Sequence, residues 1–136
     1  MEPLYVADNL EIGYEPETRI LICSWKGRQS EELIRRSGEI IYDLFQKQEG
    51  CTRILNDNTR KTGHFVHSIE YTAKNWFPRM IQAGLKRFAW VFSEDIFTEL
   101  SASLAMPNEH LDVIKVFNSY DEAMRWLLSQ EQGVYF

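Results

Sequence analysis

The sequence has few cysteines, no long apolar run and no cluster of basic residues, and each shortage excludes a class of protein. Its two cysteines, Cys23 and Cys51, stand in apolar contexts where a thiol behaves as a small hydrophobe, so we expect no disulfide. No stretch approaches the roughly 18–20 apolar residues of a membrane-spanning helix, and the first residues lack the basic and apolar regions of a signal peptide. We therefore expect a cytoplasmic protein without a membrane span.

Basic residues are outnumbered and scattered, which argues against nucleic acid as a partner. The 15 Lys and Arg residues against 20 Asp and Glu give a net charge of −5, and no segment concentrates positive charge. The phosphate-binding P-loop, the GxGxxG dinucleotide fingerprint and the GxSxG nucleophile elbow are also missing from the sequence. We expect no cofactor.

What the sequence does contain is enough apolar material for one well-filled domain. Of its 136 residues, 44% are hydrophobic and 13% aromatic, a composition typical of a folded core. No internal repeat or low-complexity linker divides the chain. We expect a single domain over residues 1–136, with an ordered core at about 10–129.

The first third of the chain predicts a β-hairpin followed by a helix. Residues 10–14 alternate apolar and polar side chains, and a Glu-Pro-Glu turn leads into the apolar run at 19–25, as expected for two antiparallel strands. Ser30 is a suitable N-cap because acidic residues follow it in the first turn. Gly50 is a suitable C-terminal stop.

The middle of the chain predicts a strand, a polar loop, a long helix and a buried strand. We expect a strand at 52–56, then the polar stretch 57–63, then a helix over 64–83 with a kink at Pro78, which lacks an amide hydrogen. The segment 88–92 is apolar on both faces, which is typical of a central strand between helix layers.

The last third predicts a short helix, a strand and a final helix. Ser93 precedes acidic residues and an apolar face that ends near Met106, and residues 111–117 alternate as a strand. Ser119 and Glu122 form a capping box that begins the last helix. The order β-β-α-β-α-β-α-β-α therefore predicts an α/β fold: a mixed sheet of four to five strands with an antiparallel edge hairpin and about four helices.

The element order, together with the closing segment Val116–Leu127 (VFNSYDEAMRWL), resembles STAS domains and the wider SpoIIAA-like fold. That resemblance implies a non-catalytic bacterial regulatory or protein-interaction module with an unknown protein partner. An alternative implied by the Sec14-type relatives of the fold is a carrier of a lipid or another small ligand. An uncharacterised enzyme is a third reading, because fold alone does not decide function.

Few residues suggest catalysis or metal binding. His64 and His67 are spaced to share one helix face, but with only Glu70 as a loose third ligand the set is incomplete, so we predict no metal site. Cys23 with a histidine would be the nucleophile and base of the enzyme reading, although no local motif surrounds this cysteine and a mid-strand thiol is usually inert.

The tryptophans have two readings that sequence leaves open. Trp25, Trp76, Trp90 and Trp126 fall on four different elements, as core packing requires, whereas a ligand cage would need several of them to converge around an open space. The aromatic surface of Tyr71, Trp76 and Phe77 could alternatively form a dimer face, and we consider a homodimer.

The functional surface is predicted where the third strand meets the second helix. Ligands of open α/β sheets bind beyond the carboxyl ends of parallel strands, and a helix N-terminus favours anions. The residues of this partner-binding or regulatory loop are Asp57, Asn58, Thr59, Arg60, Lys61, Thr62 and Gly63. In the antagonist proteins that the chain resembles, this junction carries a phosphorylated serine, which implies Thr62 as a phosphosite with Thr59 as the other hydroxyl. The plain alternative is that these side chains only satisfy loop amides and solvate the surface.

Overall fold

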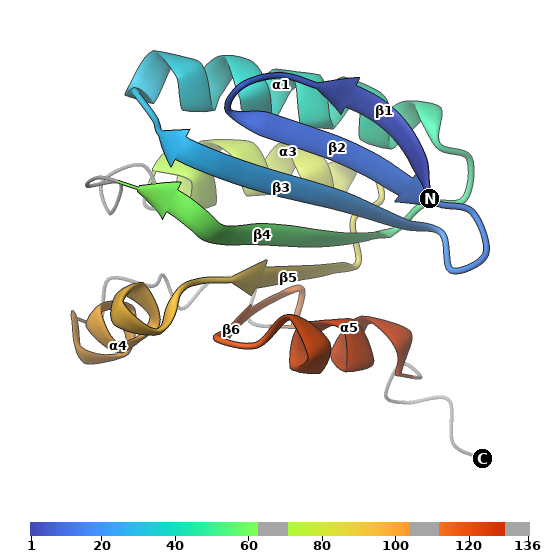
Figure 1. Cartoon of the computed structure of the whole chain (residues 1–136). Helices are drawn as coiled ribbons and strands as arrows, with labels where there is room; N and C mark the ends of the chain where they lie inside the picture. The colour runs from blue at the N-terminus through green and yellow to red at the C-terminus, as the bar shows by residue number, and fades with distance from the viewer. Residues whose placement is uncertain (63–70, 104–111, 130–136) are drawn as a thin grey trace.

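The computed structural model describes residues 1–62, 71–103 and 112–129, and within them six strands form one mixed sheet (Figure 1). Neighbouring strands follow the chain order from first to last. The first three strands pair antiparallel, and the third to the sixth pair parallel. The strands are β1 Glu2–Val6, β2 Leu10–Glu15, β3 Ile20–Arg28, β4 Arg53–Thr62, β5 Arg87–Val91 and β6 Ile114–Phe117.

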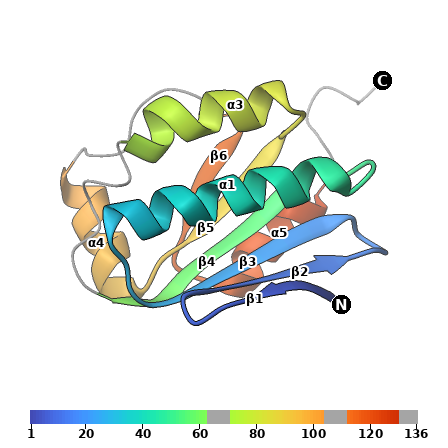
Figure 2. The ribbon, with the colours of Figure 1, turned by 90° about the horizontal axis from the view of Figure 1, so that it is seen from above.

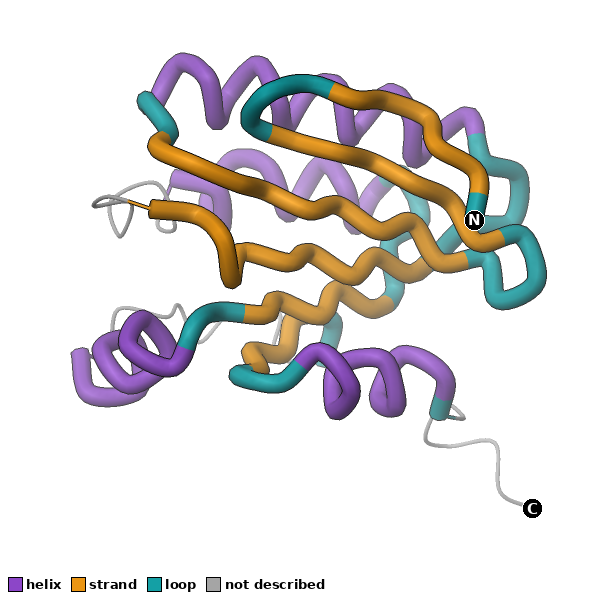
Figure 3. Tube along the Cα trace, in the orientation of Figure 1, coloured by secondary structure: helices purple, strands orange, loops and turns teal. Residues whose placement is uncertain are grey.

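Helices cover both faces of the sheet, as Figures 2 and 3 show. On one face lie α1 (Glu31–Lys47) and a π-helical segment, η1 (Thr72–Trp76), which continues into α3 (Phe77–Gln82). The opposite face carries α5 (Tyr120–Leu128), which packs on β4, β5 and β6. The remaining described helix, α4 (Glu94–Ser103), follows β5. The parallel strands are therefore sandwiched between two helix layers.

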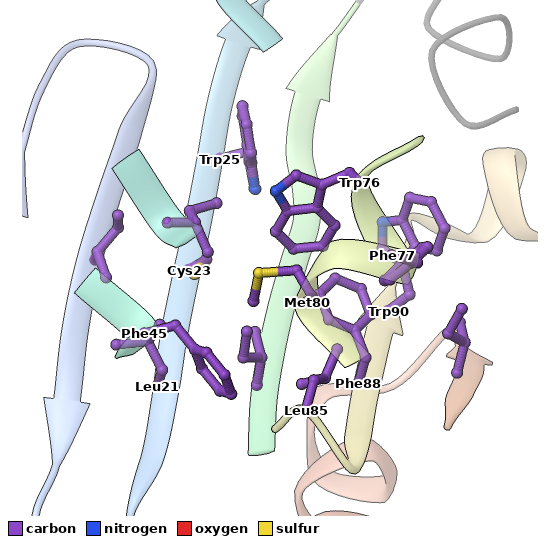
Figure 4. Packing of buried hydrophobic residues seen from close by; sticks show 14 of the residues in the cluster. Leu21, Cys23, Trp25, Phe45, Trp76, Phe77, Met80, Leu85, Phe88 and Trp90 are labelled. Atoms are coloured by element: carbon purple, nitrogen blue, oxygen red, sulfur yellow. The ribbon is translucent and has the colours of Figure 1, made fainter. Parts of the chain in front are cut away.

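Alternation along the strands produces two separate apolar cores. On β3, Leu21 and Cys23 belong to the larger core beneath α1 and α3, and part of that core is drawn in Figure 4. Ile20 and Ile22 point the other way and pack with residues of α5. Because successive side chains of a strand point to opposite faces, an uninterrupted apolar run serves both cores at once.

The expected α/β class is confirmed, and the strand expected at 88–92 lies inside the sheet as predicted, although next to the edge strand β6 and not at its centre. All five residues of β5 are buried, and the strand lies between β4 and β6. The side chains of Ser30 and Ser119 accept hydrogen bonds from the backbone N–H groups of Leu33 and Glu122, as their capping positions predicted. The π-helical segment η1 changes to the α-helix α3 next to Pro78, whose ring nitrogen has no N–H to donate, and the kink at this residue stays a prediction.

Two expectations about strands were wrong. Residues 2–6, expected to lie outside the ordered core, form the edge strand β1 against β2, so the sheet has six strands and not four or five. The polar stretch from Asp57 to Thr62, expected as a loop, is the second half of β4 and pairs with β3 as far as Arg28. Backbone pairing with a long neighbouring strand outweighs the low strand propensity of these polar side chains.

Arg87 ties the last helix to the sheet. Its buried guanidinium donates from Nη1 to the backbone oxygens of Trp126 and Ser129, the latter at 3.1 Å, and to the hydroxyl of Ser129 at 2.8 Å. The same guanidinium lies 5.2 Å from the centre of the Trp126 ring. The Trp126 carbonyl also accepts from the backbone N–H and hydroxyl of Ser129, so Arg87 adds a charged donor to carbonyls at the end of α5.

We predict that Arg87→Met lowers the free energy of unfolding by about 2 kcal/mol, because a charged donor to the helix end is lost. Urea unfolding followed by circular dichroism measures the change. The matched control is Lys86→Met, since Lys86 is the exposed neighbour. Equal unfolding midpoints for the two variants would contradict the role assigned to Arg87.

Candidate functional site

A cavity of about 430 Å³ lies between α1, η1 and the strands β3, β4 and β5. Three of the four tryptophans line it: Trp25 from β3, Trp76 from η1 and Trp90 from β5. Figure 4 shows these three side chains on the same side of the sheet. Trp25 and Trp90 belong to the carboxyl-terminal halves of their strands, so the cavity lies toward the edge where open α/β sheets usually bind ligands.

Gly38 sets the approach of Trp76 to α1. The indole Nε1 of Trp76 donates a 2.9 Å hydrogen bond to the carbonyl oxygen of Gly38, in the middle of that helix. A Cβ atom at position 38 would lie 3.2 Å from the same nitrogen, closer than most real contacts. The glycine therefore costs α1 some helix propensity and allows the indole to bridge the two helical segments that frame the cavity.

A chain of hydrogen bonds forms one wall of the cavity. Trp25 donates from Nε1 to Oδ1 of Asn56 at 2.8 Å, and Asn56 donates from Nδ2 to Oδ1 of Asn58 at 3.2 Å. An indole nitrogen is a donor only, so it requires the oxygen of Asn56, and the remaining amide of Asn56 then requires the oxygen of Asn58. Both asparagines are buried, and the Nδ2 of Asn58 makes no hydrogen bond within the described residues.

The β4 strand bulges beside this wall. Ser24 pairs with Asp57 and Lys26 pairs with Arg60, so β4 has one more residue than β3 between these two pairs. The carboxylate of Asp57 accepts hydrogen bonds from the backbone N–H and the hydroxyl of Thr59, at 2.9 and 2.7 Å. A bulge re-aims the side chains that follow it, and here it precedes Lys61.

The indole N–H of Trp90 is buried without a hydrogen-bond acceptor among the described residues. Its side chain is only 4% exposed, and its Nε1 has no hydrogen-bond partner within the part of the chain that the structure describes. Buried polar groups normally have partners, because a buried donor without an acceptor costs about 1–3 kcal/mol. Trp90 also lines the cavity, so this N–H is next to a space from which a ligand would supply the acceptor.

Positive charge surrounds the cavity. Half-buried Lys61 lies with its ammonium 4.8 Å from the centre of the Trp25 ring, and burial lowers the pKa of Lys61 to about 8. Arg35 lies over the ring of Tyr71 at 4.3 Å. Arg79 donates to both carboxylate oxygens of Glu39, and this pairing lowers the pKa of the Glu39 carboxyl.

The predicted loop residues divide between the cavity and the surface. Asn58 and Lys61 line the cavity, whereas Asp57 and Thr59 bond to each other. Arg60 and Thr62 are exposed at the end of β4, and Gly63 lies outside the described residues. The structure therefore brings two of the seven residues into a common site with the tryptophans.

The other candidate residues are placed as follows. His64, His67, Glu70 and His110 lie outside the described residues, and within 1–62, 71–103 and 112–129 no group of side chains is arranged to hold a metal ion. The dimer surface considered from the sequence consisted of Tyr71, Trp76 and Phe77. Trp76 and Phe77 are buried against the sheet, so they are not exposed for contact with a second chain.

Sequence reasoning left the convergence of the tryptophans undecided and missed the part played by Asn56. A buried strand is normally apolar throughout, so two asparagines in the strand at 53–62 were a signal, and alternation placed both on one face. Nothing local to Trp25, Trp76 or Trp90 showed that they would share a space, because their elements are far apart in the chain.

No protein-family model matches this chain, and neither does any curated protein or solved structure. Among the helices of the described residues, none is long and apolar enough to span a membrane. The site is therefore interpreted from its own geometry and chemistry.

We predict that neither thiol reacts in the native protein. Burial raises the pKa of Cys23 and of Cys51, and Cys23 is fully enclosed, so almost no thiolate is accessible at pH 7. Ellman's reagent should label both thiols only after unfolding in denaturant. Fast labelling of the folded protein would revive a nucleophilic role for Cys23.

We predict that the Trp25–Asn56 bond couples the two side chains energetically. Asn56→Leu should lower the free energy of unfolding by about 1–3 kcal/mol in the natural chain, because it leaves the buried indole N–H of Trp25 without an acceptor. In a Trp25→Phe background the same change should cost clearly less, since no donor is left unpaired. Urea unfolding of the four proteins measures the coupling, and purely additive losses would contradict it.

Proposed function

We propose that this chain is a non-catalytic binding protein whose cavity holds a small ligand with an apolar body. The observation that carries the proposal is the convergence of Trp25, Trp76 and Trp90 on one space of about 430 Å³. Sites for small molecules have volumes of roughly 300–1,000 Å³ and combine apolar or aromatic walls with a few placed polar groups. The cavity has both features.

The polar groups of the cavity suit recognition. They are the amides of Asn56 and Asn58, the indole N–H of Trp90, the hydroxyl of Thr72 and several cations at the rim. Cys23, the nucleophile of the enzyme reading, is fully buried and does not line the cavity. Of the three sequence-based readings, the small-ligand carrier is the one that this geometry favours.

The regulatory module of the STAS or SpoIIAA-like kind is a second proposal, which rests on the resemblance of the closing segment. Thr62 is exposed at the end of β4, where a kinase or a protein partner has access to it. It is the next residue after Lys61, which lines the cavity. The two proposals are compatible, because a ligand in the cavity and a partner on its rim would share β4.

We predict that the neutral fluorophore phenylnaphthylamine binds in the cavity with an increase in its emission. Ile34→Trp places a large ring in the cavity wall and should weaken binding by about tenfold or more, equivalent to about 1.4 kcal/mol. Ile40→Trp is the matched control, because Ile40 lies on the same helix and is half-buried but does not line the cavity.

Native mass spectrometry of the protein purified without organic solvent provides an independent test. A bound mass that the Ile34→Trp variant lacks and the Ile40→Trp variant retains would support the cavity as the site. Absence of fluorophore binding, or equal affinity in both variants, would overturn the proposed function.

A further inference from the structure

Two side-chain donors on residues that line the cavity have no acceptor within the described residues. One is Nε1 of Trp90, and the other is Nδ2 of Asn58, whose oxygen is already used by Asn56. The orientation of the Asn58 amide follows from the donor-only indole of Trp25 at the head of the chain of bonds. Both unused groups are therefore donors, which indicates that the missing partner is an acceptor.

The two donors are neighbours on one face of the sheet. Trp90 is the register partner of Asn56 across β4 and β5, and Asn58 lies two residues further along β4. Residues two apart on a strand point to the same side. Lys61 follows on the same strand and also lines the cavity, so a positive charge accompanies the two donors.

We propose that the ligand is an organic carboxylate with a flat aromatic body, whose acid group accepts hydrogen bonds from Asn58 and Trp90 and lies beside Lys61. This inference rests on the proposed function and specifies the chemical class of its ligand. Hydrogen bonds to an ionised acceptor are shorter and stronger than those between neutral groups. A carboxylate therefore satisfies buried donors that a neutral apolar ligand would leave unpaired.

The charge of the cavity supports an anion. The whole chain carries a net charge of −5, yet among the described residues the lining contains four cationic side chains, Arg35, Arg36, Lys61 and Arg79, and one acidic side chain, Glu39. Glu39 and Arg79 form an ion pair and neutralise each other, so the net positive charge of this lining comes from its other cationic side chains. A local excess of positive charge on an acidic protein attracts anions and disfavours cations.

The aromatic walls support a flat body. Phe88 lies between Trp76 and Trp90, with ring centroids 5.7 Å apart in each pair and nearly perpendicular planes. Rings held in this edge-to-face arrangement offer both edges and faces, against which another ring packs favourably. A flat ligand also loses little conformational entropy on binding.

The experiment compares naphthoate with its neutral analogue naphthalenemethanol, using isothermal titration calorimetry on the full-length protein. We expect naphthoate to bind at least about tenfold more tightly, as one or two charge-assisted hydrogen bonds would produce. Decanoate, which has the acid group without the ring, should bind more weakly than naphthoate. Equal or tighter binding of decanoate would overturn the aromatic part of the inference.

Two variants test the donors. Asn58→Asp keeps an oxygen for the bond from Asn56 but replaces the unused donor by a negative charge. It should abolish the preference for naphthoate and leave the affinity for naphthalenemethanol unchanged. Trp90→Phe keeps an aromatic ring and removes the N–H, and should reduce the preference about tenfold. Gln46→Glu makes the same charge change as Asn58→Asp on the exposed side of α1 and should leave the preference intact.

The outcomes distinguish failure of the carboxylate inference from failure of the proposed function. If naphthoate and naphthalenemethanol bind equally while phenylnaphthylamine still binds, the carboxylate inference is wrong and the proposed function stands. If phenylnaphthylamine fails as well, the proposed function is wrong. Circular dichroism and urea midpoints verify that each variant is folded, and a preference retained in both Asn58→Asp and Trp90→Phe would place the acid group elsewhere and overturn the inference.

Discussion

The indole N–H of Trp25 can only donate a hydrogen bond, and the polar wall of the cavity depends on that constraint. Because the indole is buried, it needs an acceptor, and Asn56 on the adjacent parallel strand provides one. That choice orients Asn56, which in turn orients Asn58. The single donor on Trp25 of β3 thus determines how the amides of Asn56 and Asn58 on β4 are oriented in the cavity wall.

The cavity lies where the pattern of a buried strand is interrupted. Elsewhere, apart from Arg87, the buried positions on the two faces of β3, β4 and β5 carry apolar side chains that pack against α1 and α3 on one side and α5 on the other. At Asn56 and Asn58 the same face carries amides, and Gly38 lets Trp76 approach α1 by its edge. Departures from an otherwise consistent pattern tend to mark functional sites, since they cost stability without improving the fold.

The region of the site could be predicted from the sequence, but its composition could not. The rule that ligands bind at the carboxyl ends of parallel strands directed attention to residues 57–63, and Asn58 and Lys61 do line the cavity. For the tryptophans, the sequence left core packing and a ligand cage both open. Trp76 and Trp90 are buried and also line the cavity, so the same side chains contribute to the core and to the cavity wall.

The sequence by itself determined the α/β class, the caps at Ser30 and Ser119 and the buried fifth strand, because each depends on spacing within a few residues. Tertiary structure decided the edge strand β1, the extension of β4 to Thr62 and the meeting of three tryptophans. These features depend on partners distant in the chain, such as the indole of Trp76 and the carbonyl of Gly38, 38 residues apart. Local propensity contains no information about such partners, since they come together only when the sheet and helices pack.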